Sequence, residues 1–200
     1  ISACLVGSEM CIRDRRYMPA REDRNPMNVF RNPKHPQRLA IETCPEGCVL
    51  VMDSRKDARA ASAGDILITR LMMRGGAGVV TDGGFRDAAS IGDLDIPAYH
   101  NRPSSPTNLT LHEAIDIDVP IGCGDVPVFP GDIVVGDDDS VIIIPAEIAD
   151  EIADEAVEMT AYEDFVTERV RQGHTIIGLY PATDEANLAL FADWRAKAGR

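Results

Sequence analysis

A buried strand, a helix and a second buried strand follow one another near the middle of the chain, and this order constrains the fold more than any other feature. Residues 48–53 (CVLVMD) and 77–81 (AGVVT) are short apolar runs, typical of strands covered on both faces. Helical spacing fills the interval between them. Neighbouring parallel strands need such a crossover, so we expect a βαβ unit and an α/β fold.

The helix of this unit is expected to begin near Gly64, with Ser62 as its cap, and to stop at Gly75 and Gly76. Its apolar residues recur at helical spacing and should turn one face toward the core: Ile66, Leu67, Leu71 and Met72.

The rest of the chain is expected to be rich in strands before it becomes helical. Residues 114–119 alternate apolar and acidic side chains, as a half-exposed strand does. The proline-containing residues 21–37 should be an irregular connector without a core element. Further strands are predicted at 96–100, 126–129, 133–135 and 141–144, and helices at 146–172 and 185–197. A length of 200 residues favours a single domain with a mixed sheet layer flanked by helices.

The first residues differ in pattern from the rest of the chain. Residues 1–15 (ISACLVGSEMCIRDR) have neither helical nor strand periodicity and resemble a translated adaptor sequence of the kind found at fragment ends in metagenomic assemblies. We therefore predict that they are not native and place them outside the fold. The domain is expected over residues 16–200, without its natural amino terminus, so that a helix and some early strands are missing.

Charge and hydropathy exclude several classes of protein. The chain carries 33 acidic and 20 basic side chains, a formal net charge of -13, and no clustered Lys or Arg, so nucleic-acid binding is not expected. No apolar run has the length of a membrane span. Five cysteines without a regular framework favour a reducing cytoplasm, and Cys44 with Cys48 lack the second pair of ligands that a zinc site needs.

The residues that carry chemistry lie around the second strand of the βαβ unit. Gly64 and Asp65 open the helix, and Arg86 with Asp87 follow the glycine-containing loop after the strand, with twenty residues between Asp65 and Arg86. Ligands of α/β folds bind at the carboxyl ends of strands, and free amides at a helix amino terminus attract anions. A small carboxylate could therefore bridge the two segments.

This spacing resembles the signature of the RraA-like family, which includes 4-hydroxy-4-methyl-2-oxoglutarate aldolases. The segments Gly124-Asp125-Val126, Pro130-Gly131-Asp132 and Gly136-Asp137-Asp138-Asp139 also resemble the strand-rich half of that family, so the similarity covers most of residues 17–180. Ser140 departs from it, because glycine is expected there. The resemblance implies an RraA-like fold of the swivelling ββα type.

The resemblance also implies roles for individual residues. Backbone amides of Gly64, Asp65, Ile66 and Leu67 would bind the substrate carboxylate, Arg86 would hold the 2-keto acid and its enolate, and Asp65 would handle the proton through a water. Asp87 would hold Mg²⁺ or another divalent metal such as Mn²⁺, because one carboxylate with several waters suits a hard cation.

Further implications concern function and assembly. The resemblance implies a metal-dependent pyruvate aldolase with oxaloacetate decarboxylase activity, acting on a small 2-keto acid. It also implies a homotrimer or hexamer with active sites between subunits, where Glu163 of a neighbouring subunit could form an outer metal-shell contact. A non-catalytic regulator that binds a ribonuclease, or another 2-keto-acid lyase or dehydratase, is the alternative.

Structural explanations compete with these roles. Arg86 and Asp87 could form a solvated surface pair, Asp65 could only stabilise the helix terminus, and Glu163 lies among other acids of a solvated helix face. His100 and His112 are interpreted as loop residues. The glycine-rich run at 75–78 precedes a strand, whereas a dinucleotide-binding fingerprint follows one, so a dinucleotide site is excluded. The three aspartates at 137–139 fit a hairpin turn better than a calcium-binding loop.

Overall fold

The computed structural model describes residues 12–199, and the chain separates into two compact units, one ending at Ala146 and the other beginning at Glu147. The helices are α1 (Pro36–Glu42), α2 (Asp65–Met73), α3 (Ala88–Gly92), α4 (Ala149–Arg171) and α5 (Glu185–Ala198), with 3-10 turns at Met27–Arg31, Asn108–Thr110 and Ala146–Ile148. The strands are β1 (Ile12–Pro19), β2 (Val49–Asp53), β3 (Ala61–Ala63), β4 (Gly78–Thr81), β5 (Gly84–Phe85), β6 (Ala98–Tyr99), β7 (Arg102–Pro103), β8 (His112–Ile117), β9 (Ile121–Cys123), β10 (Val126–Val128), β11 (Ile133–Gly136) and β12 (Val141–Ile144).

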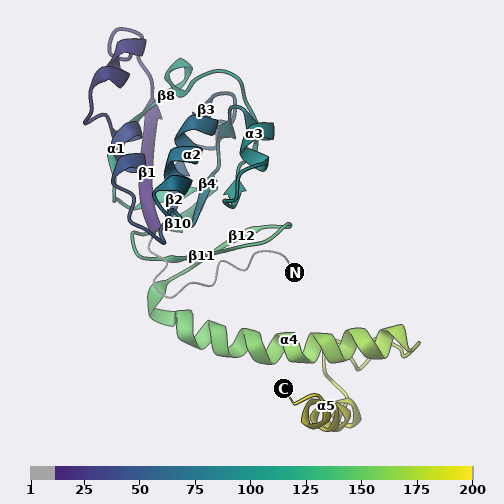
Figure 1. Cartoon of the computed structure of the whole chain (residues 1–200). Coiled ribbons are helices and arrows are strands. Elements are labelled where there is room, and N and C mark those ends of the chain that lie inside the picture. Colours follow the sequence, from purple (N-terminus) through teal and green to yellow (C-terminus); the bar gives the residue numbers. More distant parts are fainter. Residues whose placement is uncertain (1–11, 200) are drawn as a thin grey trace. The chain divides into compact units, whose positions relative to one another are not determined.

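The first unit is built on a mixed five-stranded sheet in the order β6-β4-β2-β1-β8 (Figure 1). β2 and β4 are parallel and α2 lies between them in sequence, which confirms the predicted βαβ unit. β8 is the antiparallel member and pairs with β1. The strands predicted in the second half of the chain are present within a few residues of their expected bounds.

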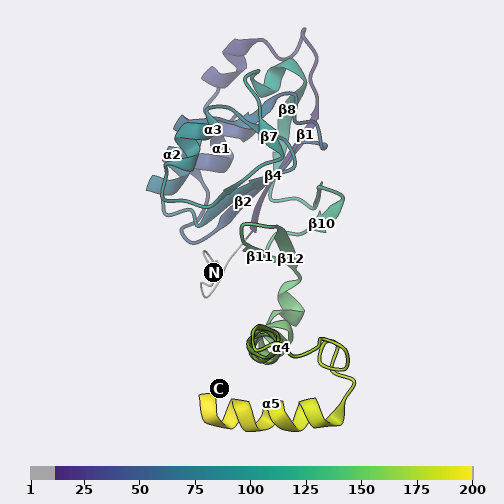
Figure 2. The same cartoon turned by 90° about the vertical axis from the view of Figure 1, so that its right-hand side faces the viewer.

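The two faces of this sheet have different coverings. One core cluster joins sheet residues such as Leu50 and Met52 to Ile41 of α1 and Ile68 of α2. The other joins Val49 and Val51 to apolar residues of β9, β10 and β11. Figure 2 shows α1, α2 and α3 grouped on one side of the sheet, away from β10, β11 and β12. The predicted mixed sheet layer flanked by helices is confirmed.

Helix α2 begins where the sequence places it, but two details differ. Gly64 is the residue before the first helical turn, and no side chain of residues 12–199 caps the helix. Ser62 lies in β3, where its hydroxyl is 2.6 Å from the Ser54 hydroxyl and 3.0 Å from that of Thr81, so the predicted capping role was wrong. Ile66 is 75% exposed, because the buried face of α2 is formed by Ile68 and Leu71.

The exclusion of all of residues 1–15 from the fold was wrong for residues 12–15. They form the first half of β1, which pairs parallel with β2 and antiparallel with β8. The strand periodicity was hidden because charged side chains, Asp14 and Arg15, occupy fully buried positions next to Ile12. Residues 1–11 lie outside the described part of the chain. The non-native origin of residues 1–15 stays a prediction, as does a single domain over residues 16–200.

The connector at residues 21–37 contains more structure than the prolines suggested. Pro36 is the first residue of α1, and His35 caps the helix by accepting a hydrogen bond from the Gln37 backbone amide at 3.3 Å. Proline fits the first helical position, where its missing N–H has no partner to lose. Ile41 of this helix is buried in the core, so the expectation of no core element was wrong at this end of the connector.

The second unit consists of α4, α5 and the segment between them. Phe165, Val166 and Leu179 form its buried cluster, with Trp194 and Phe191 packed against it. Within residues 12–199, no helix is both long and apolar enough to cross a bilayer.

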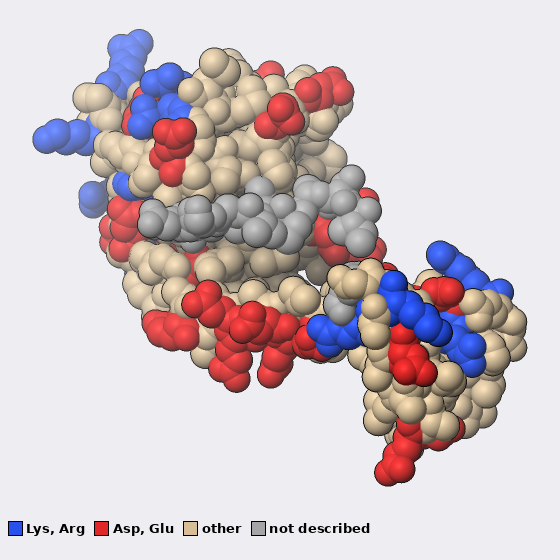
Figure 3. Space-filling model, turned by 60° about the horizontal axis from the view of Figure 1, so that its bottom comes forward, with Lys and Arg blue, Asp and Glu red and all other residues tan. Residues whose placement is uncertain are grey.

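Acidic side chains exceed basic ones by 33 to 20. Figure 3 shows one face of the molecule on which Asp and Glu side chains gather in a band. An anionic ligand therefore depends on local positive groups rather than on the overall field.

Candidate active site

The structure brings Gly64, Arg86 and Asp87 together, as the sequence predicted. A methyl group built on Gly64 would lie 3.1 Å from Asp87 Oδ2 and 3.5 Å from Arg86 Nε. The contact is fixed by the backbone, because the Arg86 amide donates a hydrogen bond to the Ala63 carbonyl at 2.9 Å. The start of α2 and the end of the loop after β4 therefore form one site.

Arg86 and Asp87 form an ion pair in this site. Arg86 Nε lies 3.2 Å from Asp87 Oδ2, and the two side chains are 51% and 38% exposed. Asp87 has a left-handed backbone conformation (φ 59°, ψ 36°), which aspartate tolerates better than most residues, and it directly precedes α3. Among described residues, Asp87 Oδ1 accepts no hydrogen bond, so one carboxylate oxygen faces solvent or a ligand.

Asp65 already has a structural role at this helix terminus. Its Oδ1 accepts a hydrogen bond from the Ile66 amide at 2.7 Å, and the Leu67 amide donates to the Gly64 carbonyl at 3.1 Å. Two of the amides predicted to bind a substrate carboxylate, those of Ile66 and Leu67, thus already donate hydrogen bonds within the chain. A bound carboxylate would take over the Ile66 amide only if the Asp65 side chain turned away, which would free Asp65 for a water.

Close packing fixes the loop that leads to Arg86. The Asp82 carboxylate accepts hydrogen bonds from the amides of Ser54 (2.6 Å), Lys56 (2.9 Å) and Gly124 (3.2 Å). A methyl group on Gly84 would lie 2.6 Å from Ser104 Cβ and 3.1 Å from a backbone oxygen. Only glycine fits there without a shift, so the short sheet β3-β5-β7 sets the position of Arg86.

Beside Arg86 lies a cavity of about 160 Å³. Gly64, Ile66 and Leu67 form part of its wall, together with residues that sequence reasoning missed: Phe30, Gln37, Arg38 and Asn108. Gln37 and Asn108 are buried, and Gln37 Nε2 donates to Asn108 Oδ1 at 3.0 Å. Gln37 and Asn108 are 71 positions apart, so no local sequence pattern predicts that they form a buried hydrogen bond. The helix that begins at Pro36 could have been predicted, because proline is favoured at the first helical position.

Glu163, the predicted outer-shell residue, belongs to the second unit. Its Oε1 accepts a hydrogen bond from the Tyr180 hydroxyl at 2.9 Å. A role across a subunit interface stays a prediction.

Asp87 is the residue expected to hold a divalent metal ion, and its surroundings limit the kind of ion that fits. Among residues 12–199, no three His, Cys, Asp or Glu side chains are grouped so that they could hold a metal ion. Asp87, with one oxygen unengaged and partial exposure, fits a cation that keeps most of its water shell, as Mg²⁺ does. It does not fit a site made only of protein ligands.

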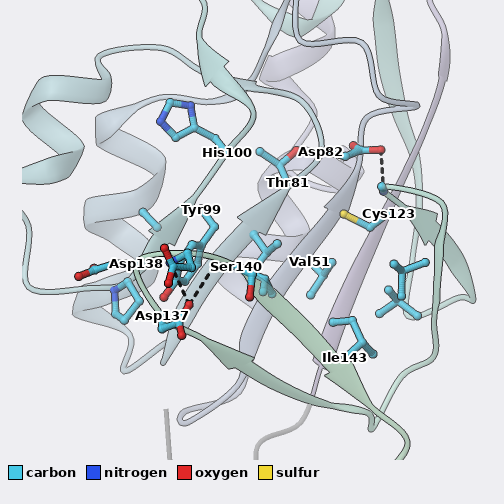
Figure 4. Close-up of a pocket in the computed structure, with 18 residues that line it drawn as sticks. Val51, Thr81, Asp82, Tyr99, His100, Cys123, Asp137, Asp138, Ser140 and Ile143 are labelled. Carbon is cyan, nitrogen blue, oxygen red and sulfur yellow. Dashed lines mark hydrogen bonds between the residues drawn. The ribbon is translucent and has the colours of Figure 1, made fainter. Parts of the chain in front are cut away.

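A larger cavity, about 750 Å³, lies between the sheet and the β11–β12 hairpin, apart from Arg86. Figure 4 shows Val51, Tyr99 and Ile143 around it, with Asp82 hydrogen-bonded at its edge. The acids at the hairpin tip form a turn in which Asp137 Oδ1 accepts from the amides of Asp139 and Ser140, each at 2.9 Å. The predicted hairpin turn is confirmed, and Ser140 needs no left-handed backbone.

The two histidines interpreted as loop residues differ. His112 begins β8, so that interpretation was wrong; it is fully buried against the Tyr17 ring, and burial lowers its pKa to about 4. His100 lies after β6, where its ring stacks on Phe85 with centroids 5.0 Å apart. Within the described part of the chain, neither histidine lines the cavity beside Arg86.

Comparison with known proteins decides the family. The model of the RraA-like family, described as Aldolase/RraA, matches residues 26–143. The chain belongs to the RraA-like family. The matched region contains Gly64, Arg86 and Asp87, and it ends before the helices of the second unit.

Curated relatives agree with this assignment. Over 99 residues the chain is 37% identical to a protein of Halalkalibacterium halodurans that carries the provisional name 4-hydroxy-4-methyl-2-oxoglutarate aldolase; the alignment covers 50% of this chain and 47% of the relative. An uncharacterised protein of Methanocaldococcus jannaschii is 35% identical over 106 residues, covering 52% and 50%. The chain thus spans about half the length of the curated relatives it matches.

Solved structures share the RraA-like fold. RraAS2 of Streptomyces coelicolor, described as an unusual member of the RNase ES inhibitor RraA protein family, superposes with a TM-score of 0.66 at 30% identity, covering 78% of this chain and 74% of that one. An uncharacterised protein of Pseudomonas syringae gives a TM-score of 0.70 at 20% identity, covering 86% and 76%, which shows the fold alone.

Proposed function

We propose that this chain is a divalent-metal-dependent carbon–carbon lyase that splits a 4-hydroxy-2-oxo acid into pyruvate and a carbonyl product, with oxaloacetate decarboxylation as a related activity. The observation that supports it is the contact of the Gly64 backbone with the Arg86 guanidinium and the Asp87 carboxylate. A cation and an anion held side by side at a helix start can bind a 2-oxo acid and a hydrated metal ion in one place.

Arg86 would bind the substrate and its reactive form. Cleavage breaks the C3–C4 bond of the substrate, and the electron pair of that bond becomes the enolate of pyruvate. The negative charge that develops on the C2 oxygen is stabilised by a guanidinium that is already in position. Gly64 and the first amides of α2 would hold the C1 carboxylate.

Proton transfer is assigned to Asp65. The proton leaves the C4 hydroxyl as the carbonyl product forms, and a proton is returned to C3 of the enolate to give pyruvate. Asp65 Oδ2 has no partner among described residues, and Oδ1 is released when the substrate carboxylate takes over the Ile66 amide, so the Asp65 carboxylate can orient a water for both transfers.

Asp87 would hold Mg²⁺ or a similar ion. When bound, this ion supplies Lewis-acid polarisation of the 2-oxo group. We further propose a homotrimer or hexamer in which Glu163 reaches the metal shell of a neighbouring subunit, and a cytoplasmic location, which suits the cysteine usage of the sequence.

The test is pyruvate release from oxaloacetate and from 4-hydroxy-4-methyl-2-oxoglutarate, followed with a coupled assay with and without Mg²⁺. We expect release with Mg²⁺, and its loss on chelation and in the variant Asp87→Asn. Release that is independent of both metal and Asp87 contradicts the proposal.

A second candidate function is regulation of a ribonuclease by protein contact. It is supported by the similarity to RraAS2, whose family is described as an inhibitor of RNase ES. The two functions separate in one comparison, because an Arg86→Lys variant should lose lyase activity and keep any inhibition that depends only on the surface of the fold.

A further inference from the structure

A second arginine, Arg38, lines the cavity beside Arg86. Arg38 lies on α1, and its guanidinium carbon is 5.0 Å from the centre of the Phe30 ring, which also lines the cavity. Stacking on an aromatic ring fixes the plane of an arginine side chain and leaves its N–H groups free to point outward.

Arg38 has no anionic partner in the described structure. Among residues 12–199, no carboxylate lies within 4.0 Å of its guanidinium, whereas Arg86, the other arginine that lines this cavity, pairs with Asp87. In a chain with a net charge of -13, a half-buried arginine that lines a cavity and has no carboxylate partner is available to a negatively charged group of a ligand.

The surroundings of Arg38 are fixed rather than adaptable. Gln37, the preceding residue, is buried and donates to the Ser62 carbonyl at 3.3 Å and to Asn108 Oδ1 at 3.0 Å. These bonds tie α1 to β3, and β3 leads directly to Gly64 and the start of α2. Arg38 and the Arg86 site are therefore connected through hydrogen-bonded elements, α1 and β3.

We propose that Arg38 is a specificity-determining residue that binds the distal carboxylate of the substrate, while Arg86 and Gly64 hold the 2-oxo acid end. This inference rests on the proposed function for the role of Arg86. A volume of about 160 Å³ suits a small acid of a few carbons, and two guanidiniums in one cavity match two carboxylates better than one.

The test uses two ligands that differ only at the distal end. 2-Oxoglutarate carries a second carboxylate, and 2-oxopentanoate has a methyl group in its place. Their affinities are measured by calorimetry in the presence of Mg²⁺ on the full chain. We expect wild type to prefer 2-oxoglutarate, and Arg38→Gln to weaken its binding by about 10- to 100-fold, the value of one charged hydrogen-bonded contact. Binding of 2-oxopentanoate should change less than about twofold.

Two further variants and one control complete the design. Arg38→Lys keeps the charge and should retain part of the preference, which a loss of folding would not reproduce. Arg86→Lys should weaken both ligands alike. Arg31→Gln removes an exposed arginine at the end of the preceding 3-10 turn, which is absent from the cavity lining, and should change neither affinity.

Several outcomes overturn the inference. Equal binding of the two acids by wild type, or equal weakening of both by Arg38→Gln, shows that Arg38 does not read the distal carboxylate. If the preference depends on Arg38 but no pyruvate is released from any substrate, the role of Arg38 stands and the proposed lyase function fails.

Discussion

At the scale of single residues, Arg86 is the side chain on which the proposed chemistry depends most. Its planar fork can hold two oxygens through parallel hydrogen bonds, and a lysine ammonium keeps the charge without this geometry. Half of the side chain is exposed, so its replacement should disturb the site and not the core.

We predict that Arg86→Lys lowers kcat for oxaloacetate decarboxylation by about 10²-fold, together with kcat/KM, because the lost contact is strongest in the transition state. Oxalate, a planar mimic of the pyruvate enolate, should inhibit the variant more weakly. Arg70→Lys is the matched control, since Arg70 pairs with Glu42 on the surface of α2. Wild-type kinetics and unchanged oxalate inhibition in Arg86→Lys would remove the enolate role.

Asp14 is a second residue with a specific consequence. It is fully buried in β1, and neither carboxylate oxygen has a hydrogen-bond partner among described residues. Burial, with the nearby charges of Asp118 and Asp132, raises the pKa of Asp14 from 3.8 to about 7. An unpaired acid in a core strand is a feature expected if residues 1–15 are foreign to the fold.

The sign of the resulting pH dependence follows from the direction of this shift. The folded state favours the protonated carboxyl, so the penalty is absent below pH 3.8, grows up to about pH 7 and is complete above it. The difference in pKa corresponds to about 4 kcal/mol at most. We predict that Asp14→Val raises the free energy of unfolding at pH 8 by about 1–4 kcal/mol and flattens its dependence between pH 5 and 8. Urea denaturation measures the free energy of unfolding and its dependence on pH. The control Asp116→Asn replaces an exposed residue of β8 and should change neither quantity.

At the scale of elements, the spacing of apolar residues predicted the helices and strands that have a regular pattern. It did not predict the role of Ser62 or the strand β1. The βαβ unit, the hairpin and the long helix were visible because their apolar residues recur at fixed spacing. Ser62 was misplaced because a serine before a helix looks like a cap, whereas here it joins a buried hydroxyl cluster with Ser54 and Thr81. β1 was missed because charged residues occupy its buried positions.

The site divides in the same way. The proximity of Gly64 to Arg86 and Asp87 could be predicted, because a βαβ unit brings the start of its helix close to the loop at the end of its second strand. Arg38 and Gln37 could not, since only the folded chain brings α1 to the start of α2, and no sequence pattern of either helix encodes that approach.

A prediction at this scale concerns the short strand β5. Gly84→Ala would place a methyl group 2.6 Å from Ser104 Cβ and force β3, β5 and β7 apart. We expect a loss of about 1–3 kcal/mol in the free energy of unfolding, and a fall in kcat because Arg86 lies two residues later. Gly122→Ala on β9 is the control, since a methyl group there meets nothing within 4 Å. Equal stability of the two variants in thermal unfolding would show that β5 does not constrain the site.

At the scale of the whole molecule, the question is whether residues of the second unit contribute to the site of a neighbouring chain. We predict that Glu163→Gln lowers turnover, and that mixing it with Arg86→Lys chains, after dissociation and reassembly, restores part of the activity. Restoration is expected because some interfaces in mixed oligomers then contain both native residues. Glu155→Gln, on the same helix and exposed, should keep full activity. Full activity of Glu163→Gln in an intact oligomer would return Glu163 to the solvated face of α4.

The three amides that share the Asp82 carboxylate come from separate stretches of the chain, two beside β2 and one after β9. Because the three amides donate to the same carboxylate, the loss of that carboxylate would break all three hydrogen bonds together. In deuterated water the amides of Ser54, Lys56 and Gly124 should therefore exchange at similar rates and accelerate together in Asp82→Ala, which removes both acceptor oxygens, so that one side chain controls the opening of two loops that are distant in sequence.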